Sequence, residues 1–267
     1  MILLAAALVL IRVLPGEPAI LLARMVTLSY LALRRDYRRE IRLNYQRLLG
    51  KPSSLFWIKN GWRVGRNLAL MAQIGSARGE KLVDRAVVYR ENNKSSNDKQ
   101  DLEQKMHMIM ASFHFGLWEF LPSFFANRGY NVGVMVSRQR DATIDYFIRR
   151  IRENKGVKYI YSVRDLLFRL SRPGITGFML DNTSSGTQTK LKLENGVYLQ
   201  LPSLAFASAQ KAGMKVVPIF SYLENGRLKV RLFSPGDELA AINAFVKIVR
   251  EMPEEWVFWG KSGALAK

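Results

Sequence analysis

The sequence contains no cysteine and only two histidines, His107 and His114, in 267 residues. Without cysteine, disulfides, thiolate zinc sites and cysteine nucleophiles are all excluded. With two histidines, a metal site would depend on carboxylates for most of its ligands, so we expect catalysis without a metal or another cofactor. Acidic residues are also few, since 22 Asp and Glu oppose 41 Lys and Arg and leave a net charge of +19. This charge predicts an anionic partner: nucleic acid, lipid headgroups or an acidic carrier protein.

An unbroken apolar run of the ~20 residues that a spanning helix needs is also missing. Residues 1–10 are almost wholly apolar, but Arg12 and the proline-rich residues 15–18 interrupt them before a second apolar segment at residues 19–33. We therefore expect two short apolar helices that form a membrane anchor, residues 1–33, lying in the membrane or dipping into it. A secretory signal peptide is the alternative, but a positively charged leading region and a small-residue cleavage site are both missing.

A cluster of arginines between residues 34 and 47 follows the apolar segment directly. Basic residues in this position are attracted to anionic lipid and follow the positive-inside bias, which predicts that this side is cytoplasmic. For any single arginine of the cluster, a solvated helix face is the simpler interpretation.

The rest of the chain, residues 34–267, is expected to form a single α/β domain, with a mixed central sheet flanked by helices. We predict this fold because, after residue 106, apolar segments of strand length alternate with segments that have a helical pattern. The expected strands are residues 107–113, 132–136, 159–161, 177–180, 216–220 and 229–232, and the expected helices begin near residues 117, 144, 163, 203 and 239. Upstream we expect a helix over residues 55–72, with Phe56, Trp62, Leu68 and Leu70 buried, and a polar stretch over residues 83–105.

His114 and Glu119 are close in sequence at the end of the first of these strands. Gly116 permits a sharp turn, which would place His114 at a strand-to-helix junction, where side chains face the ligand crevice of an open α/β sheet. A neutral imidazole can accept a proton near neutral pH, and a carboxylate such as Glu119 can orient it. Residues five apart do not share a helix face, so contact requires the first of them to lie in the turn. A chance histidine beside a capped helix is the alternative.

Polar residues follow two other expected strands, at residues 137–141 and 181–186. Because strand ends meet at one rim of such a sheet, we expect both loops to converge with His114. Asp181 is either part of this site or a turn or cap residue.

These residues resemble the late acyltransferases of bacterial lipid A biosynthesis, a branch of the lysophospholipid acyltransferase superfamily. The family's defining motif is a histidine, four residues and an acidic residue, which His114 to Glu119 match, with the branch's glycine and tryptophan between them. Four further segments are similar to family blocks, and the likeness covers most of the chain: residues 136–139 with Arg138, 180–186 with Asp181 and Gly186, 216–218, and 252–259 with a Pro-Glu-x-Trp pattern. The sequence departs from the family at Asn182, where glutamine is usual, at the less regular residues 196–205, and after the last tryptophan.

The resemblance implies transfer of a fatty acyl chain from a thioester, on acyl carrier protein or coenzyme A, to a hydroxyl of an anionic glycolipid of the lipid A type. It implies that His114 is the general base and that Glu119 orients it, at the cytoplasmic face of the bacterial inner membrane. An arginine at position 138 would bind phosphate or carboxylate as a planar fork. The other residues expected at the substrate site are Asp181, Asn182, Gly186 and Arg152. For Arg152, as for Arg149 and Arg150, a solvated helix surface is the alternative.

The sequence leaves two rival functions open. The first is acyl transfer to another lipid, a lysophospholipid or a phosphoinositide mannoside, although Trp118 within the motif favours the glycolipid branch. The second is nucleic-acid binding, which would explain the net charge of +19 but leaves the apolar N-terminus and His114 without a role. Because no nucleic-acid motif is present, we do not expect nucleic acid as a partner.

Overall fold

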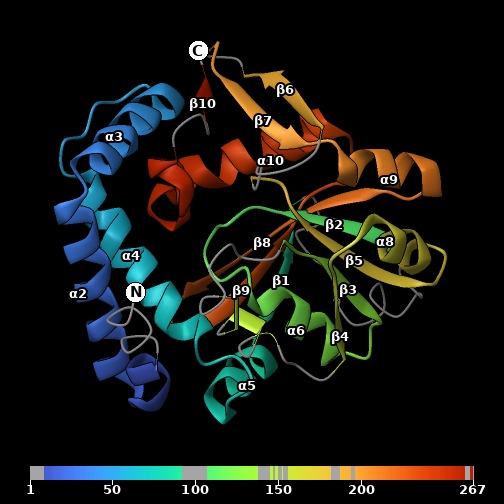
Figure 1. The fold of residues 1–267 in the computed structure, drawn as a ribbon, viewed down its shortest axis with the longest axis horizontal. Coiled ribbons are helices and arrows are strands. Elements are labelled where there is room, and N and C mark those ends of the chain that lie inside the picture. Colours follow the sequence, from blue (N-terminus) through green and yellow to red (C-terminus); the bar gives the residue numbers. More distant parts are fainter. Residues whose placement is uncertain are drawn as a thin grey trace.

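A computed structural model describes residues 9–91, 107–137, 145, 146, 148, 149, 152, 156–181, 187–193, 196–261, 265 and 266. Its centre is a seven-stranded sheet with helices on both faces, which confirms the predicted α/β class (Figure 1). Across the sheet the strands run in the order β1 (Val87–Arg90), β9 (Arg227–Leu232), β8 (Val216–Glu224), β2 (His107–Ser112), β5 (Gly174–Met179), β3 (Val132–Met135) and β4 (Val157–Ile160). Only β8 and β9 pair antiparallel, so the sheet is mixed.

The central strand β2 shows why the sheet is covered on both sides. Ile109 and Ala111 belong to one buried hydrophobic cluster and Met110 to another, because successive side chains of a strand point to opposite faces. The first cluster lies under α8 (Val163–Leu170), α9 (Leu204–Ala212) and α10 (Glu238–Glu251), and the second under α5 (Ala77–Asp84) and α6 (Phe120–Ala126). Parallel strands covered on both faces are apolar over continuous runs, as β2 is at residues 108–111.

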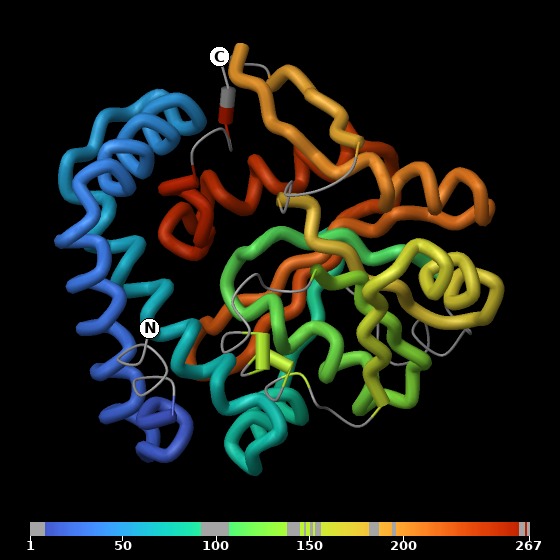
Figure 2. Tube along the Cα trace, viewed as in Figure 1, coloured from blue at the N-terminus to red at the C-terminus, as the bar shows by residue number. Residues whose placement is uncertain are grey.

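Three helices at the N-terminal end form a wall beside this sheet: α2 (Gly16–Leu33), α3 (Arg35–Leu49) and α4 (Phe56–Met71) (Figure 2). Helices α2 and α4 approach closely because Gly61 and Gly65 line the contact. A Cβ atom on Gly65 would lie 2.6 Å from the Cα of Arg24, and one on Gly61 would lie 2.7 Å from Leu31 Cδ1. This small-x-x-x-small spacing is a common device for close helix packing.

Of the described residues, α2 is the one helix long and apolar enough to cross a membrane, with a mean hydropathy of 1.2 and 22% of its residues buried. The helical residues 9–13 precede it across the expected proline break, whereas residues 1–8 lie outside the described part. The ends of helix α4 agree with the prediction within a residue or two. The predicted burial of Trp62 and Leu68 is wrong, because each is 41% exposed. Phe56 and Leu70 are buried as predicted.

A second sheet was not predicted from the sequence. It has the order β10 (Leu265–Ala266), β7 (Tyr198–Pro202) and β6 (Gln188–Lys192), and all its pairs are antiparallel. Strand β1 was also missed, because it lies within the polar stretch and pairs with β9 from much later in the chain. Of the helix expected near residues 144–151, residues 145, 146, 148, 149 and 152 are described and helical. After α10 come two single-turn 3₁₀ helices, η1 (Pro253–Glu255) and η2 (Phe258–Gly260).

Candidate active site

His114 lies in the turn between β2 and α6, where the sequence predicted it. Gly116 makes this turn possible: its φ is +60°, and a Cβ atom there would lie 2.0 Å from the carbonyl oxygen of Ser221. The next residue, Leu117, donates its backbone N–H to the same oxygen at 2.8 Å. Any side chain at position 116 would therefore disturb the junction that presents His114.

The side chain of His114 contacts Asp181. The Nδ1 atom of His114 lies 2.7 Å from Oδ1 of Asp181, and the backbone N–H of His114 donates to Oδ2 at 2.8 Å. These residues meet because β2 and β5 are neighbours, with Ser112 opposite Met179 at their carboxyl ends. Burial alone would raise the pKa of Asp181, but the charge and hydrogen bonds of His114, together with a hydrogen bond from Trp256, lower it below its usual value. An ionised carboxylate only accepts hydrogen bonds, so Nδ1 carries a proton, and in the neutral imidazole Nε2 is then the acceptor.

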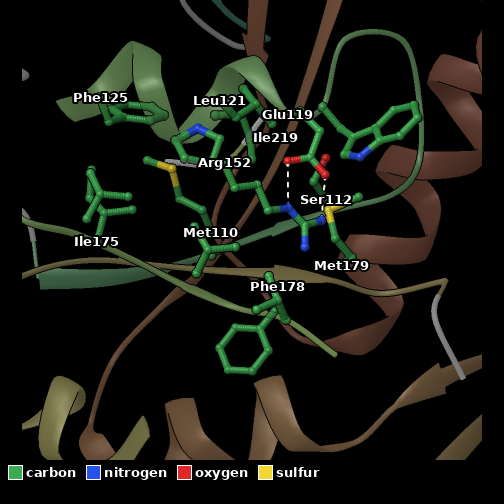
Figure 3. A pocket seen from close by; sticks show the side chains of 16 residues that line it. Met110, Ser112, Glu119, Leu121, Phe125, Arg152, Ile175, Phe178, Met179 and Ile219 are labelled. Carbon is green, nitrogen blue, oxygen red and sulfur yellow. Dashed lines mark hydrogen bonds and ion pairs between the residues drawn. The ribbon is translucent and has the colours of Figure 1, made fainter. Parts of the chain in front are cut away.

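Glu119 contacts Arg152 and not His114. Two hydrogen bonds join them, from Nη2 to Oε1 at 2.6 Å and from Nε to Oε2 at 3.1 Å (Figure 3). Burial alone would lower the pKa of Arg152, but the charge and hydrogen bonds of Glu119 raise it. The prediction that Glu119 orients His114 is therefore corrected. Glu119 lies at the start of α6, on the far side of the turn from His114, and the Nδ1 atom of His114 is bound by Asp181 instead.

Two cavities adjoin at this ion pair. One, of about 580 Å³, has His114 in its wall together with Ser137, Thr187 and Ser203. The other, of about 60 Å³, is a narrow apolar space between the sheet and α6. Arg152, Val136, Phe178 and Met179 line both cavities. Figure 3 shows Phe125 and Ile175 at the end of the narrow cavity farthest from Glu119.

Aromatic and basic residues from the C-terminal segment complete the surroundings of the His114–Asp181 pair. The indole N–H of Trp256 donates to Asp181 Oδ2 at 2.9 Å, and Nζ of Lys261 donates to the Asp181 backbone oxygen at 3.0 Å. The rings of Phe258 and Trp118 lie 4.5 and 5.2 Å from the His114 ring, centroid to centroid. From the sequence, Trp256 and Phe258 belonged to the segment with the Pro-Glu-x-Trp pattern, and no role was predicted for either residue.

The four predicted site residues that the structure describes form two pairs, His114 with Asp181 and Glu119 with Arg152. Arg152 was expected to meet substrate directly, but its guanidinium group is bound by Glu119 at the wall between the cavities. Arg138, Asn182 and Gly186 lie outside the described residues. Within the described part of the chain, no group of three His, Cys, Asp or Glu side chains could hold a metal ion.

The arrangement can perform general-base chemistry. A neutral imidazole whose Nδ1–H is held by a buried carboxylate presents Nε2 as a base and is stabilised when it becomes charged. The side chain of His114 is 17% exposed, whereas that of Asp181 is only 3% exposed. The base therefore faces a cavity while its partner is shielded from water.

Comparison with known proteins relates the chain to a sequence family and to solved structures. The sequence profile of the bacterial lipid A biosynthesis acyltransferases matches residues 1–230. The comparison with curated protein sequences gives no match. A similar solved structure is that of the 1-acyl-sn-glycerophosphate acyltransferase PlsC from Thermotoga maritima, which is 13% identical, with a TM-score of 0.36 over 88% of this chain and 94% of that one.

Proposed function

Because the chain belongs to the bacterial lipid A biosynthesis acyltransferase family, we propose that it transfers a fatty acyl chain from a thioester to a hydroxyl of an anionic glycolipid of the lipid A type. The chain is an acyltransferase that acts on lipid, and the proposal adds the reaction, the acceptor and the residues. The observation that carries the proposal is the 2.7 Å contact between His114 and Asp181 in the wall of an open cavity.

In the proposed reaction, Nε2 of His114 removes the proton of the acceptor hydroxyl as its oxygen attacks the thioester carbonyl. The new carbon–oxygen bond forms an ester, the carbon–sulfur bond breaks, and the imidazolium returns its proton to the leaving thiolate. Asp181 holds the imidazole in the productive tautomer and stabilises its charged form. A direct attack of this kind needs no acyl-enzyme, which agrees with a chain that has no cysteine.

The narrow apolar cavity is the proposed place for the acyl chain. Its lining residues Met110, Val134 and Ile175 bring apolar surface from three strands, and an alkyl chain gains roughly 0.8 kcal/mol for each methylene that leaves water. The Glu119–Arg152 pair at its wall is proposed to fix the passage between the cavity of His114 and this apolar space. Phe125 and Trp118 also line this cavity and are proposed to limit the length of the acyl chain.

The partners follow from charge and from the family. The net charge of +19 suits a phosphorylated acceptor and an acidic carrier protein as acyl donor, with coenzyme A as the alternative donor. We propose Arg138 as the arginine that binds an anionic group of the substrate, by resemblance to the family. Residues 1–33 are proposed as the membrane anchor, placing the site at the cytoplasmic face of the inner membrane, and residues 34–267 as one catalytic domain.

The test compares two histidine variants of the full-length protein in detergent, using an acyl thioester and lipid A precursor. His114→Ala should abolish acyl transfer, because no other described side chain with an imidazole lines the cavity. His107→Ala is the matched control: its Nε2 contacts the backbone oxygen of Leu170 at 2.9 Å, at the opposite end of β2, and activity should persist. Turnover by His114→Ala near the wild-type rate would exclude His114 as the base.

A further inference from the structure

Trp256 makes a contact that the proposed reaction does not by itself require. Among the residues that the structure describes, it is the one hydrogen-bond donor to the Asp181 carboxylate besides His114. Its side chain is fully buried, and an indole N–H can only donate. Two of the three hydrogen bonds to the carboxylate come from His114, so Trp256 fixes Asp181 independently of the residue that Asp181 has to orient.

The backbone around Trp256 is bound to the turn that carries His114. The N–H of Gly116 donates to the carbonyl oxygen of Glu255 at 3.0 Å, and the N–H of Val257 donates to that of His114 at 2.9 Å. Phe115 and Trp256 form an isolated antiparallel bridge. The indole and the imidazole are therefore parts of one hydrogen-bonded unit, although they are far apart in sequence.

Helix α4 holds this unit from the other side. Nδ2 of Asn60 donates to the backbone oxygens of Trp256 at 2.8 Å and of Glu254 at 3.0 Å. The carboxylate of Glu255, itself buried, accepts from Asn67 at 2.5 Å and from Arg66 at 3.2 Å. These contacts, together with those to the His114 turn, hold the backbone from η1 to Trp256 in place.

We propose that Trp256 is a positioning residue for the reaction: through its indole N–H it holds the Asp181 carboxylate in place and sets the proton affinity of the His114–Asp181 pair. This inference rests on the proposed function of His114. The titratable groups that face Asp181 among the described residues are His114, from the turn after β2, and Lys261, which donates to its backbone oxygen from the segment after η2.

The direction in which loss of the Trp256 N–H shifts the pH dependence of activity follows from the charge of Asp181. A donor to the carboxylate disperses its negative charge, so removing the donor makes the carboxylate a better partner for the imidazolium. The active form of His114 is the neutral imidazole. A more stable imidazolium loses its proton only at higher pH, so the acid limb of the pH–rate profile should move to higher pH. A role of Trp256 in packing alone would lower activity at all pH values without moving that limb.

Trp259 provides a matched control. It is also fully buried, its indole lies 4.8 Å from that of Trp256, and its N–H donates at 2.7 Å to the backbone oxygen of Pro253, away from the site. Trp256→Phe and Trp259→Phe therefore remove the same group from the same aromatic cluster, and only the first touches Asp181. Thermal unfolding of both variants measures what each loses in packing.

The experiment measures kcat against pH for the wild type, both tryptophan variants and His114→Ala. We expect Trp256→Phe to lower kcat about tenfold and to raise the acid limb by about one pH unit, the size of effect of a hydrogen bond to a charged group. Trp259→Phe should leave the limb in place. Equal limbs in the two tryptophan variants would overturn the positioning role, whereas activity in His114→Ala would instead overturn the proposed function.

A second readout does not depend on activity. With only two histidines in the chain, the ring nitrogens of ¹⁵N-histidine-labelled protein give two sets of NMR signals, and His107 serves as the internal reference. Trp256→Phe should shift the Nδ1 signal of His114, and Trp259→Phe should not. An unchanged His114 signal in Trp256→Phe would contradict the proposal.

Discussion

Asp181→Asn keeps the shape of the side chain and removes its charge, which makes it an informative change at this site. In the structure Oδ2 of Asp181 accepts two N–H groups, from the His114 backbone and from Trp256, while Oδ1 faces Nδ1. An asparagine would satisfy both donors only with its oxygen in the Oδ2 position. Its NH₂ group would then face Nδ1, which must give up its proton to accept, and the proton would move to Nε2.

The consequence is a base in the wrong tautomer. The corresponding change in the serine protease triad costs about 10⁴-fold in kcat, so we expect a loss of about 10³- to 10⁴-fold here, or about 4 to 5.5 kcal/mol of transition-state stabilisation. The acid limb should also move to lower pH, because the charge that stabilises the imidazolium is gone. The assay is acyl transfer to lipid A precursor over a pH series, with the protein's folding checked by thermal unfolding.

Glu119→Gln is the contrasting variant. Because Glu119 is bound to Arg152 and not to His114, its loss should lower activity by disturbing the wall between the cavities, without moving the acid limb. If Glu119→Gln moved the limb and Asp181→Asn kept near-wild-type kcat, Glu119 would be the partner of His114 and the orienting role of Asp181 would be refuted.

Asp181 also links folding to pH. Its pKa is lowered in the folded protein, so it contributes stability that is present above its unfolded value of about 3.9 and is lost as the pH falls through the folded value. Asp181→Asn should therefore flatten the dependence of the free energy of unfolding on pH in that acidic range. An unchanged slope would show that the carboxylate is not stabilised by folding.

Two further predictions concern the acyl chain and the membrane. Phe125→Ala should extend the narrow cavity at its far end and shift the preferred donor to longer acyl chains in a competition between thioesters, whereas an unchanged preference would show that the chain does not reach Phe125. Deletion of residues 1–33 should release the protein from the membrane fraction without detergent, because it removes the apolar α2; a full-length protein that is already soluble would contradict the anchor.

The fold was largely predictable because its signals are local. Helix α8 begins at Val163 as expected, since Ser162 caps it by accepting from the N–H of Asp165, and β2 is an apolar run that ends in a glycine turn. The local signal of strand β1 is short, because only Val87, Val88 and Tyr89 favour a strand within a polar stretch, and the strand pairs with β9 from much later in the chain. The β6–β7 hairpin has a local signal in the sequence: the dipeptide Asn-Gly at residues 195–196 is typical of hairpin turns, and the buried Leu199 and Leu201 alternate with half-buried residues after it.

The site was predictable only in part, because its decisive contacts join distant segments. The spacing of His114 and Glu119 suggested a pair, yet the partner of His114 is Asp181, brought to it by the pairing of β2 with β5. Trp256 reaches Asp181 from a C-terminal segment held by α4. A sequence pattern can identify such residues as functional. The folded structure is needed to show which side chains contact each other.

The most direct test of the proposed reaction is mass spectrometry of the lipids from cells that express the wild-type protein or His114→Ala. We expect that a lipid A species gains the mass of one ester-linked acyl chain with the wild type and not with the variant. A gain confined to glycerophospholipids or phosphoinositide mannosides, or lipid profiles that are identical for the two proteins, would contradict the proposal.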